Sequence, residues 1–265
     1  MSDAGDRLAR VLRRIGAVDV AVSGGVDSLT LAASAHALLG MQARMHHAVS
    51  PAVPPEATAR TRAIAEERSW RLEIFDAGEF ADARYRANPA DRCFFCKTNL
   101  YAAIAARAAG TIVSGTNTDD LADWRPGLRA AAEHGVRHPF VEAGIDKATV
   151  RALAAELGLG SVAALPASPC LSSRIETGIR VEPALLGLVH GAERLVTETL
   201  APRTVRARVR AAGLVVELDA DALERLPPHR AALLDALGAL SERPVSFAPY
   251  RTGSAFVRPH MQTPA

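Results

Sequence analysis

The sequence predicts an α/β protein: a doubly wound, mostly parallel sheet followed by a smaller α+β domain. In the first 165 of the 265 residues, strand-like and helix-like segments alternate, as they do in repeated βα units. The order changes after about Leu165, where a long amphipathic helix is followed by two adjacent strand-like segments. We therefore predict one domain over residues 1–165 and a second over residues 166–265.

Strands in the first domain are expected where short apolar runs end in turn residues. The first run ends at a double glycine, and the helix after it stops at Gly40, a common residue just beyond a helix C-terminus. Parallel strands of this kind place ligand-binding loops at their carboxyl ends. The expected strands are 18–22, 43–49, 71–75 and 111–115, and the expected helices are 29–39, 56–68, 94–109 and 146–157.

The second domain follows a linker-like stretch at residues 166–169. Helices are expected over 182–200 and over 222–240, the latter broken at Pro227 and Pro228. Strands are expected over 204–210, 214–218 and 244–247.

The composition is that of a globular enzyme. Hydrophobic residues make up 49% and charged residues 23% of the chain, and the formal net charge is +2. This charge argues weakly against a dedicated RNA-binding surface, and no apolar run is long enough to span a membrane. The acidic start of the chain lacks the apolar segment of a signal peptide, so a cytoplasmic location is expected. In that reducing compartment, three cysteines are not expected to form disulfides.

A turn with two glycines joins the first strand to the first helix, and it consists of Ser23, Gly24, Gly25, Val26, Asp27 and Ser28. The glycines let the backbone approach a phosphate, and the helix start offers unpaired N–H groups and a positive dipole end. No lysine follows the glycines, so this is not a Walker loop. The segment resembles the PP-loop of the ATP pyrophosphatases, which split ATP into AMP and pyrophosphate. The alternative is an ordinary strand–turn–helix with a polar cap.

Polar residues also follow the strand at 111–115, namely Gly115, Thr116, Asn117, Asp119 and Asp120. In a doubly wound sheet, loops at this edge bind ligands. The expected roles are contact with adenosine and ligation of Mg²⁺ by a carboxylate. Capping of the next helix is a compatible alternative, because Asp and Thr are good caps.

The three cysteines are Cys93, Cys96 and Cys170. The first two have the spacing that lets two thiolates share a metal or cluster, with a redox pair or two packed thiols as alternatives. The third lies in a polar loop, which suggests a [4Fe–4S] cluster with three thiolates and one open iron. Zinc is the rival and would need a fourth ligand, but no histidine lies at a ligand spacing from the cysteines. Lys97 follows directly and would steady a phosphate or thiolate, or else be a solvated helix lysine.

Basic residues share one face of the strand at 204–210, where they are spaced two apart. These residues are Arg206, Arg208 and Arg210. Three arginines are too much charge for a buried face, so we expect it to bind a phosphate or carboxylates, or to be exposed or a subunit contact. The turn at 250–254 is a further candidate anion site.

Five segments together resemble the LarE-type ATP-dependent sulfur transferases of the PP-loop ATP pyrophosphatase superfamily. They occur in the order found in that family and extend over nearly the whole chain. The segments are 23–28, 88–97, 115–120, 168–174 and 250–254. The combination is specific, although the glycine turn alone is not. It implies a fold like that of the adenine nucleotide alpha hydrolases.

The resemblance also implies a reaction. LarE-type enzymes adenylate the carboxylates of pyridinium-3,5-biscarboxylic acid mononucleotide with ATP, and a sulfur nucleophile then displaces AMP and leaves a thiocarboxylate. The product serves the nickel-pincer nucleotide cofactor of lactate racemase and related enzymes. Some members sacrifice the sulfur of the cysteine equivalent to Cys170, whereas three-cysteine members are described as holding a [4Fe–4S] cluster with a transferable sulfide. Members form hexamers, so the resemblance implies that the α+β domain binds substrate and mediates oligomerisation. The residues of this chain do not identify its sulfur donor.

The site residues expected for this chain fall into five groups. ATP and pyrophosphate contacts are Ser23, Gly24, Gly25, Val26, Asp27, Ser28, Gly115, Thr116 and Asn117. Cluster ligands are Cys93, Cys96 and Cys170, and candidate Mg²⁺ ligands are Asp27 and Asp119. Catalytic residues are Cys170, Lys97 and Arg174, and contacts to the substrate or its phosphate are Arg208, Arg210, Arg251 and Ser254. The expected partner is a small mononucleotide rather than nucleic acid or a membrane.

Three other functions fit parts of the pattern. A PP-loop tRNA thiolase shares the adenylation step and some use a three-cysteine cluster, but those have lysine where this chain has Val26. This chain also lacks a strongly basic extension and a second CxxC pair. An ammonia-using amidating synthetase would not need the cysteines. An AMP-binding sensor would bind AMP without releasing pyrophosphate.

Overall fold

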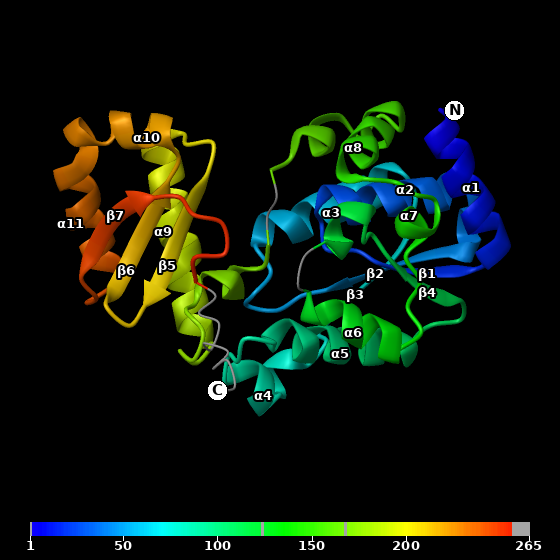
Figure 1. Ribbon diagram of the computed structural model, residues 1–265, viewed down its shortest axis with the longest axis horizontal. Helices are drawn as coiled ribbons and strands as arrows, with labels where there is room; N and C mark the ends of the chain where they lie inside the picture. The colour runs from blue at the N-terminus through cyan, green and yellow to red at the C-terminus, as the bar shows by residue number, and fades with distance from the viewer. Residues whose placement is uncertain (1, 123–124, 167–168, 256–265) are drawn as a thin grey trace, which may run out of the picture. The chain divides into compact units, whose positions relative to one another are not determined.

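The structure, a computed structural model, describes residues 2–122, 125–166 and 169–255 (Figure 1). They fall into two compact units, the first made of residues 2–82 and 93–166, and the second of residues 83–92 and 169–255. The short segment 83–92 thus packs with the later part of the chain, which the hydrophobic pattern of the sequence does not indicate. The roles expected for the two sequence domains stay predictions.

In the first unit, the described residues form a sheet of four parallel strands in the order β3-β2-β1-β4. The strands are β1 (Val18–Ala21), β2 (Ala43–Ala48), β3 (Arg71–Phe75) and β4 (Thr111–Ser114). β1 has neighbours on both sides and is buried at every position, whereas β3 lies at an edge and alternates between exposed and half-buried residues until its last one. The predicted parallel sheet is therefore confirmed.

Helices cover both faces of this sheet (Figure 1). One face carries α1 (Asp3–Ile15), α2 (Val26–Leu39), α3 (Pro55–Glu67) and α8 (Lys147–Glu156), and the other carries α5 (Arg92–Ala105) and α6 (Pro126–Glu133). Right-handed crossovers explain the division, because the chain moves from β1 to β2 to β3 in one direction and then returns to β4 beyond β1. Shorter helices are α7 (Pro139–Glu142), η1 (Gly40–Gln42), η2 (Glu79–Ala81), η3 (Thr118–Leu121) and η4 (Gly160–Ala164).

The first helix, α1, was not among the elements expected from the sequence. Ser2 caps its start by accepting a hydrogen bond from the N–H of Gly5. Leu8, Val11 and Leu12 are spaced three and four apart and are buried. This apolar spacing after a serine cap is the signal from which the helix could have been found.

The end of α5 is set by a buried carboxylate. The helix ends at Ala105, not at residue 109 as the sequence predicted. Asp19 on β1 is fully buried and accepts a hydrogen bond from the N–H of Gly110 at 2.7 Å. The same carboxylate pairs with Arg44 and lies 2.7 Å from Nε2 of His46. Because a buried carboxylate needs such partners, the chain before β4 turns toward Asp19 instead of continuing as a helix.

The second unit contains a small mixed sheet in the order β5-β6-β7. β5 and β6 are antiparallel, whereas β6 and β7 are parallel. The strands are β5 (Val205–Arg210), β6 (Gly213–Leu218) and β7 (Val245–Pro249). The helices are α4 (Ala83–Arg86), η5 (Leu171–Arg174), α9 (Pro183–Leu200), α10 (Ala220–Arg225), η6 (Pro227–His229) and α11 (Arg230–Leu240). The predicted smaller sheet and the helix break at Pro227 are confirmed.

The longest described helix is α9, with 18 residues. It packs against β5 and buries Leu186, Val189, Val196 and Leu200 along one face. Neither α9 nor any other helix in the described part of the chain has both the length and the apolar character that crossing a membrane requires.

Candidate functional site

The glycine turn lies between the end of β1 and the start of α2, in the first unit. Ser28 is buried, and its hydroxyl holds the turn closed through two hydrogen bonds. Its Oγ accepts from the N–H of Ser23 at 3.0 Å and donates to the carbonyl oxygen of Gly25 at 3.1 Å. The Oγ of Ser23 lies 3.1 Å from the same hydroxyl. α2 begins at Val26, directly after this closed turn. Its first N–H groups therefore start from a fixed backbone, which is the arrangement that binds anions at helix ends.

Gly24 is required in this turn by conformation and by space. Its φ is +81°, and an added Cβ would lie 2.7 Å from the carbonyl oxygen of Ala57 on α3. Arg60, one turn further along α3, donates from Nη1 to the Gly24 carbonyl at 2.7 Å. Sequence reasoning missed Arg60, because nothing in its spacing sets it apart from the other arginines. It adds a positive charge beside the turn.

The loop after β4 packs directly on the glycine turn. A Cβ at Gly115 would lie 2.8 Å from the carbonyl carbon of Asp27 and 2.9 Å from the backbone nitrogen of Ser28. Asn117 donates from Nδ2 to Oδ1 of Asp27 at 3.3 Å. Asn117 also caps η3 in a reciprocal capping box with Asp120, so the capping interpretation is confirmed. The structure thus brings the two predicted loops together at the carboxyl ends of β1 and β4.

Thr116 connects this loop to a half-buried histidine. Its Oγ1 lies 3.2 Å from Oγ of Ser114, which lies 2.9 Å from Nδ1 of His138. Burial lowers the pKa of His138, and the charges of Glu142 and Asp120 only partly oppose this. The imidazole is therefore neutral at neutral pH. His138 was not identified from the sequence, because the link exists only through the hydroxyl of Ser114.

Asp27 carries a second partner that the sequence did not reveal. Nζ of Lys147, at the start of α8, lies 2.5 Å from Oδ2 of Asp27. The backbone N–H of Lys147 donates to Oδ2 of Asp119 at 3.2 Å. The two candidate Mg²⁺ ligands thus lie around one lysine. The scarcity of lysine in the chain is a signal that could have drawn attention to it.

Substituting Gly115 with alanine is expected to weaken ATP binding about tenfold or more. The added methyl group would press on the backbone of Asp27 and Ser28, and overpacking of this kind costs roughly 1–3 kcal/mol. Titration calorimetry with Mg-ATP measures the effect. Gly187→Ala is the matched control, because no heavy atom lies within 4 Å of a Cβ there and affinity is expected to be unchanged. Equal affinity in both variants would mean that the contact at Gly115 does not shape a nucleotide site.

Cys93, Cys96 and Lys97 lie in the first two turns of α5. Residues three apart on a helix lie on the same side, so the two half-buried cysteines share a face. The start of α6 approaches them closely because residue 127 is glycine: a Cβ on Gly127 would lie 3.0 Å from Cγ of Lys97. Nζ of Lys97 lies 5.7 Å from the ring centre of Tyr101, within the range of a cation–π contact. A contact of Lys97 with phosphate stays a prediction.

Cys170 lies in the second unit, directly before η5, and Ser168 of the same motif lies outside the described residues. Arg174 holds this loop from within. Its Nη1 donates to the carbonyl of Pro169 at 2.6 Å and of Cys170 at 3.2 Å. Its Nε and Nη2 bind the carboxylate of Glu193 on α9 at 2.8 and 3.1 Å. Arg174 is thus a buried residue that shapes the cysteine loop, and its contact with a substrate stays a prediction.

The predicted phosphate-binding residues of the second unit converge on Glu217 of β6, which sequence reasoning did not select. Arg208 donates from Nε to Oε2 of Glu217 at 3.1 Å, and Arg210 donates from Nη2 to Oε1 at 2.9 Å. The Oγ of Ser254 and the N–H of Arg251 reach the same carboxylate at 2.5 and 3.5 Å. The expectation that this strand face is too charged to be buried is wrong at Arg208, whereas Arg206 and Arg210 are half-buried. Arg208 is only 3% exposed, because Glu217 compensates its charge.

Glu217 is held in its charged form by these neighbours. Burial favours the neutral carboxyl, but the hydrogen bond from Ser254 and the charge of Arg208 outweigh it and keep the pKa of Glu217 below its ordinary value. The guanidinium of Arg206, the third arginine of the strand, lies 5.9 Å from the ring centre of Tyr250. Arg210 also lies 4.0 Å from the carboxylate of Glu176, so Arg208 and Arg210 both face carboxylates and an anion bound there would have to share them.

Glu217→Gln is expected to lower the free energy of unfolding by roughly 3–5 kcal/mol at neutral pH, because it leaves buried arginine charge without its partner. Since the pKa of Glu217 is lower in the folded protein, its contribution is full above the unfolded value of about 4.3 and is lost as the pH falls through the folded pKa. Denaturant unfolding at several pH values should show this loss in the native protein and not in the variant. Glu224→Gln, at an exposed position, is the control. A native-like pH dependence in Glu217→Gln would contradict the assignment.

The proposed cluster ligands are divided between the two units: Cys93 and Cys96 belong to the first and Cys170 to the second. Thiolates are the donors that iron–sulfur clusters use, so the three residues fit such a group in kind. Within the described residues, no three His, Cys, Asp or Glu side chains form a metal-binding group.

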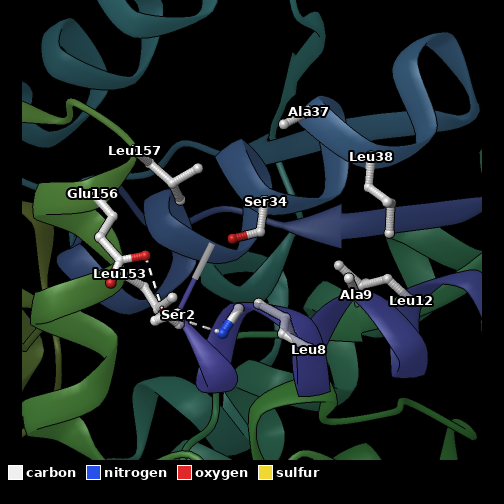
Figure 2. A pocket seen from close by; sticks show the side chains of 11 residues that line it. Ser2, Leu8, Ala9, Leu12, Ser34, Ala37, Leu38, Leu153, Glu156 and Leu157 are labelled. Carbon is white, nitrogen blue, oxygen red and sulfur yellow. Dashed lines mark hydrogen bonds between the residues drawn. The ribbon is translucent and has the colours of Figure 1, made fainter.

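A separate cavity of about 500 Å³ lies between α1, α2 and α8 (Figure 2). It is lined mostly by leucine and alanine, and Ser2 donates to Glu156 across one side of it at 3.0 Å. Ser34 and Leu38 place it beside the later turns of α2, whereas the glycine turn is at the start of that helix. Its lining contains no lysine or arginine, so it is unsuited to a triphosphate.

No protein-family model matches the chain. It is 39% identical over 178 residues to the uncharacterized protein slr1717 of Synechocystis sp., an alignment that covers 66% of each chain. It is 33% identical over 93 residues to the uncharacterized protein MJ0830 of Methanocaldococcus jannaschii, which covers 34% of this chain and 36% of that protein. The chain thus spans less than two thirds of these two relatives.

A third relative has a named activity. The chain is 30% identical over 206 residues to the pyridinium-3,5-bisthiocarboxylic acid mononucleotide synthase of Lactiplantibacillus plantarum, an alignment that covers 76% of this chain and 74% of that protein. Similarity of this extent reaches across both structural units, since it exceeds the length of either. The chain therefore belongs to the LarE-type family of pyridinium-3,5-bisthiocarboxylic acid mononucleotide synthases.

Proposed function

We propose that the protein is an ATP-dependent sulfurtransferase of nickel-pincer nucleotide cofactor synthesis. It would convert the carboxylates of pyridinium-3,5-biscarboxylic acid mononucleotide to thiocarboxylates and release AMP and pyrophosphate. The observation that carries the proposal is the packing of the glycine turn against the loop after β4. Nucleotides bind at this edge of doubly wound sheets, and a PP-loop fold is part of the proposal. The substrate class comes from the L. plantarum relative, which is named for the bisthiocarboxylic mononucleotide.

The adenylation step would use the first unit. A carboxylate oxygen of the substrate would attack the α-phosphorus of ATP, and the bond from that phosphorus to pyrophosphate would break. The N–H groups at the start of α2 would stabilise the charge on the departing pyrophosphate, and Ser28 would keep them in place. Asp27 and Asp119 offer the carboxylate oxygens that Mg²⁺ prefers. Adenylation makes a poor leaving group into a good one, because the oxygen then departs with AMP.

The sulfur-transfer step would use the cysteine loop of the second unit. A sulfur nucleophile would attack the carbonyl carbon of the adenylate, and AMP would leave with the electrons of the carbon–oxygen bond. Cys93, Cys96 and Cys170 would hold a [4Fe–4S] cluster, which supplies an iron site for a transferable sulfide when it is bound. Arg174 would keep the backbone at Cys170 in place. Lys97 would act on the substrate as a cation.

The mononucleotide would be held at the cluster of charges around Glu217. Arg208, Arg210, Arg251 and Ser254 would bind its phosphate, and Glu217 would fix the direction of the two strand arginines. A cytoplasmic location and a hexameric assembly complete the proposal.

The experiment is anaerobic and follows two products. Cluster-reconstituted protein is mixed with Mg-ATP and the biscarboxylate mononucleotide, and pyrophosphate and the mass of the mononucleotide are measured, with a substrate-free control. We expect substrate-dependent pyrophosphate and the mass change of an oxygen-to-sulfur exchange. More than one turnover per chain would favour the cluster over sacrifice of Cys170. No pyrophosphate with this substrate, but release with tRNA, would reject the proposal in favour of a thiolase.

A further inference from the structure

Lys147 connects three segments of the first unit that are distant in sequence. Its Nζ lies 2.5 Å from Oδ2 of Asp27, the second residue of α2. Its backbone N–H donates to Asp119 in the loop after β4. Asn117 of that loop donates to the other carboxylate oxygen of Asp27. The ammonium group therefore lies at the N-terminal end of α2, where the phosphates of ATP are proposed to bind.

The ion pair is open to solvent. The side chain of Lys147 is 30% exposed and that of Asp27 is 28% exposed. Pairs with this much exposure add little to stability, typically less than about 1 kcal/mol. The pair can therefore break and re-form at small cost, so stability alone does not account for a lysine at this place.

Lysine is also better suited than arginine to exchange one anionic partner for another. Of the 31 lysine and arginine residues in the chain, only Lys97 and Lys147 are lysines. Arginine binds a carboxylate through a rigid two-pronged contact, as Arg174 binds Glu193. Lysine presents a single charge on a flexible chain and can turn from one anion to another. The chain thus has a lysine, rather than its much more common arginine, at a position that contacts two carboxylates.

The pair creates a competition at Asp27. A carboxylate that is neutralised by an ammonium group attracts a divalent cation weakly, so a cation that binds Asp27 must displace Lys147. We propose that Lys147 is a phosphate-binding residue that changes partner: it holds Asp27 in the absence of nucleotide, and it turns to the phosphates when a divalent cation and ATP bind. The phosphates bring the negative charge that receives the displaced ammonium group. This inference rests on the proposed function for the identity of the nucleotide.

The first test measures Mn²⁺ binding to the protein without nucleotide, by electron paramagnetic resonance of the free ion. Lys147→Gln is expected to bind Mn²⁺ about fivefold more tightly than the native protein, because the competing charge is gone. Lys147→Arg should bind no more tightly than the native protein. Arg14→Gln, which removes an exposed charge from α1, should not change the affinity. Thermal unfolding of each variant shows that the fold is intact.

The second test measures pyrophosphate release as a function of the ATP concentration. Lys147→Gln is expected to lower kcat/KM for ATP about 10- to 100-fold, and Lys147→Arg should restore part of it. Unchanged kcat/KM in Lys147→Gln would overturn the phosphate role. Equal Mn²⁺ affinity in the native protein and Lys147→Gln, or no binding by either, would overturn the exchange at Asp27. Tighter Mn²⁺ binding by Lys147→Gln in a protein that releases no pyrophosphate would uphold the exchange and reject the proposed function, so the two failures are distinguishable.

Discussion

Replacing Ser28 with alanine is expected to reduce substrate-dependent pyrophosphate release about 100-fold or more. The hydroxyl of Ser28 is the acceptor for the N–H of Ser23 and lies within donating distance of the Gly25 carbonyl. Loss of the hydroxyl leaves the partly buried N–H of Ser23 without its acceptor and the Gly25 carbonyl without its donor, so the turn would change shape. The N–H groups at the start of α2 would then no longer form a fixed site, and their fixed position is what stabilises a developing charge.

Ser34→Ala is the matched control for this variant. Ser34 is on the same helix and donates to the carbonyl of Thr30 at 2.9 Å, but it lies well beyond the glycine turn. Its removal should leave pyrophosphate release unchanged. Asp27→Ala should resemble Ser28→Ala, because Asn117 and Lys147 both lose their partner. Native rates in Ser28→Ala and Asp27→Ala would reject the glycine turn as the ATP site.

The first sheet could be predicted because its signals are local. Each strand is a short run bounded by Gly, Pro or polar residues, and some of the helices begin or end at a capping residue. Gly40 beyond α2 and Asp146 before α8 are examples, the latter accepting a hydrogen bond from the N–H of Thr149 at 2.8 Å. The position of the candidate site could be predicted as well, since parallel strands place their carboxyl ends at one edge of the sheet.

The partners of the site residues could not be predicted, because they come from distant parts of the chain. Lys147 is 120 positions from Asp27 in sequence, and Glu193 is 19 positions from Arg174 on a helix whose other face is apolar. A single sequence does not say which acid meets which base. The motifs therefore identified the loops, whereas the ion pairs within them depend on the tertiary structure.

The basic strand shows how this gap produced an error. Alternate arginines on one face predict a face with too much charge to bury, which holds only for arginines without acidic partners. Glu217 on the neighbouring strand provides a carboxylate for Arg208 and Arg210. Its position opposite Arg206 follows from the register of β5 with β6, which a single sequence does not reveal. Whether a charged face is buried depends on the strand beside it and not on its own pattern.

Cys170→Ala is expected to reduce formation of the thiocarboxylate below about 0.1% of the native rate, as loss of a nucleophile or its ligand does. Pyrophosphate release should stay within about threefold of native, because adenylation is assigned to the first unit. The loop should keep its shape, since Arg174 holds it through the backbone carbonyls of Pro169 and Cys170 and not through the thiol. Normal product yield from Cys170→Ala would remove Cys170 from the mechanism.

The same measurement on Cys93→Ala and Cys96→Ala separates the two sulfur sources. If a cluster carries the sulfide, each of the three variants loses product, because each removes a ligand. If Cys170 gives up its own sulfur, only Cys170→Ala fails, and the native chain stops after one sulfur per protein with a matching loss of mass. Cys93 and Cys96 share one face of α5, so a pair of bound thiolates there is chemically reasonable in either case. Full product from Cys93→Ala and Cys96→Ala would therefore reject the cluster while leaving the adenylation site intact.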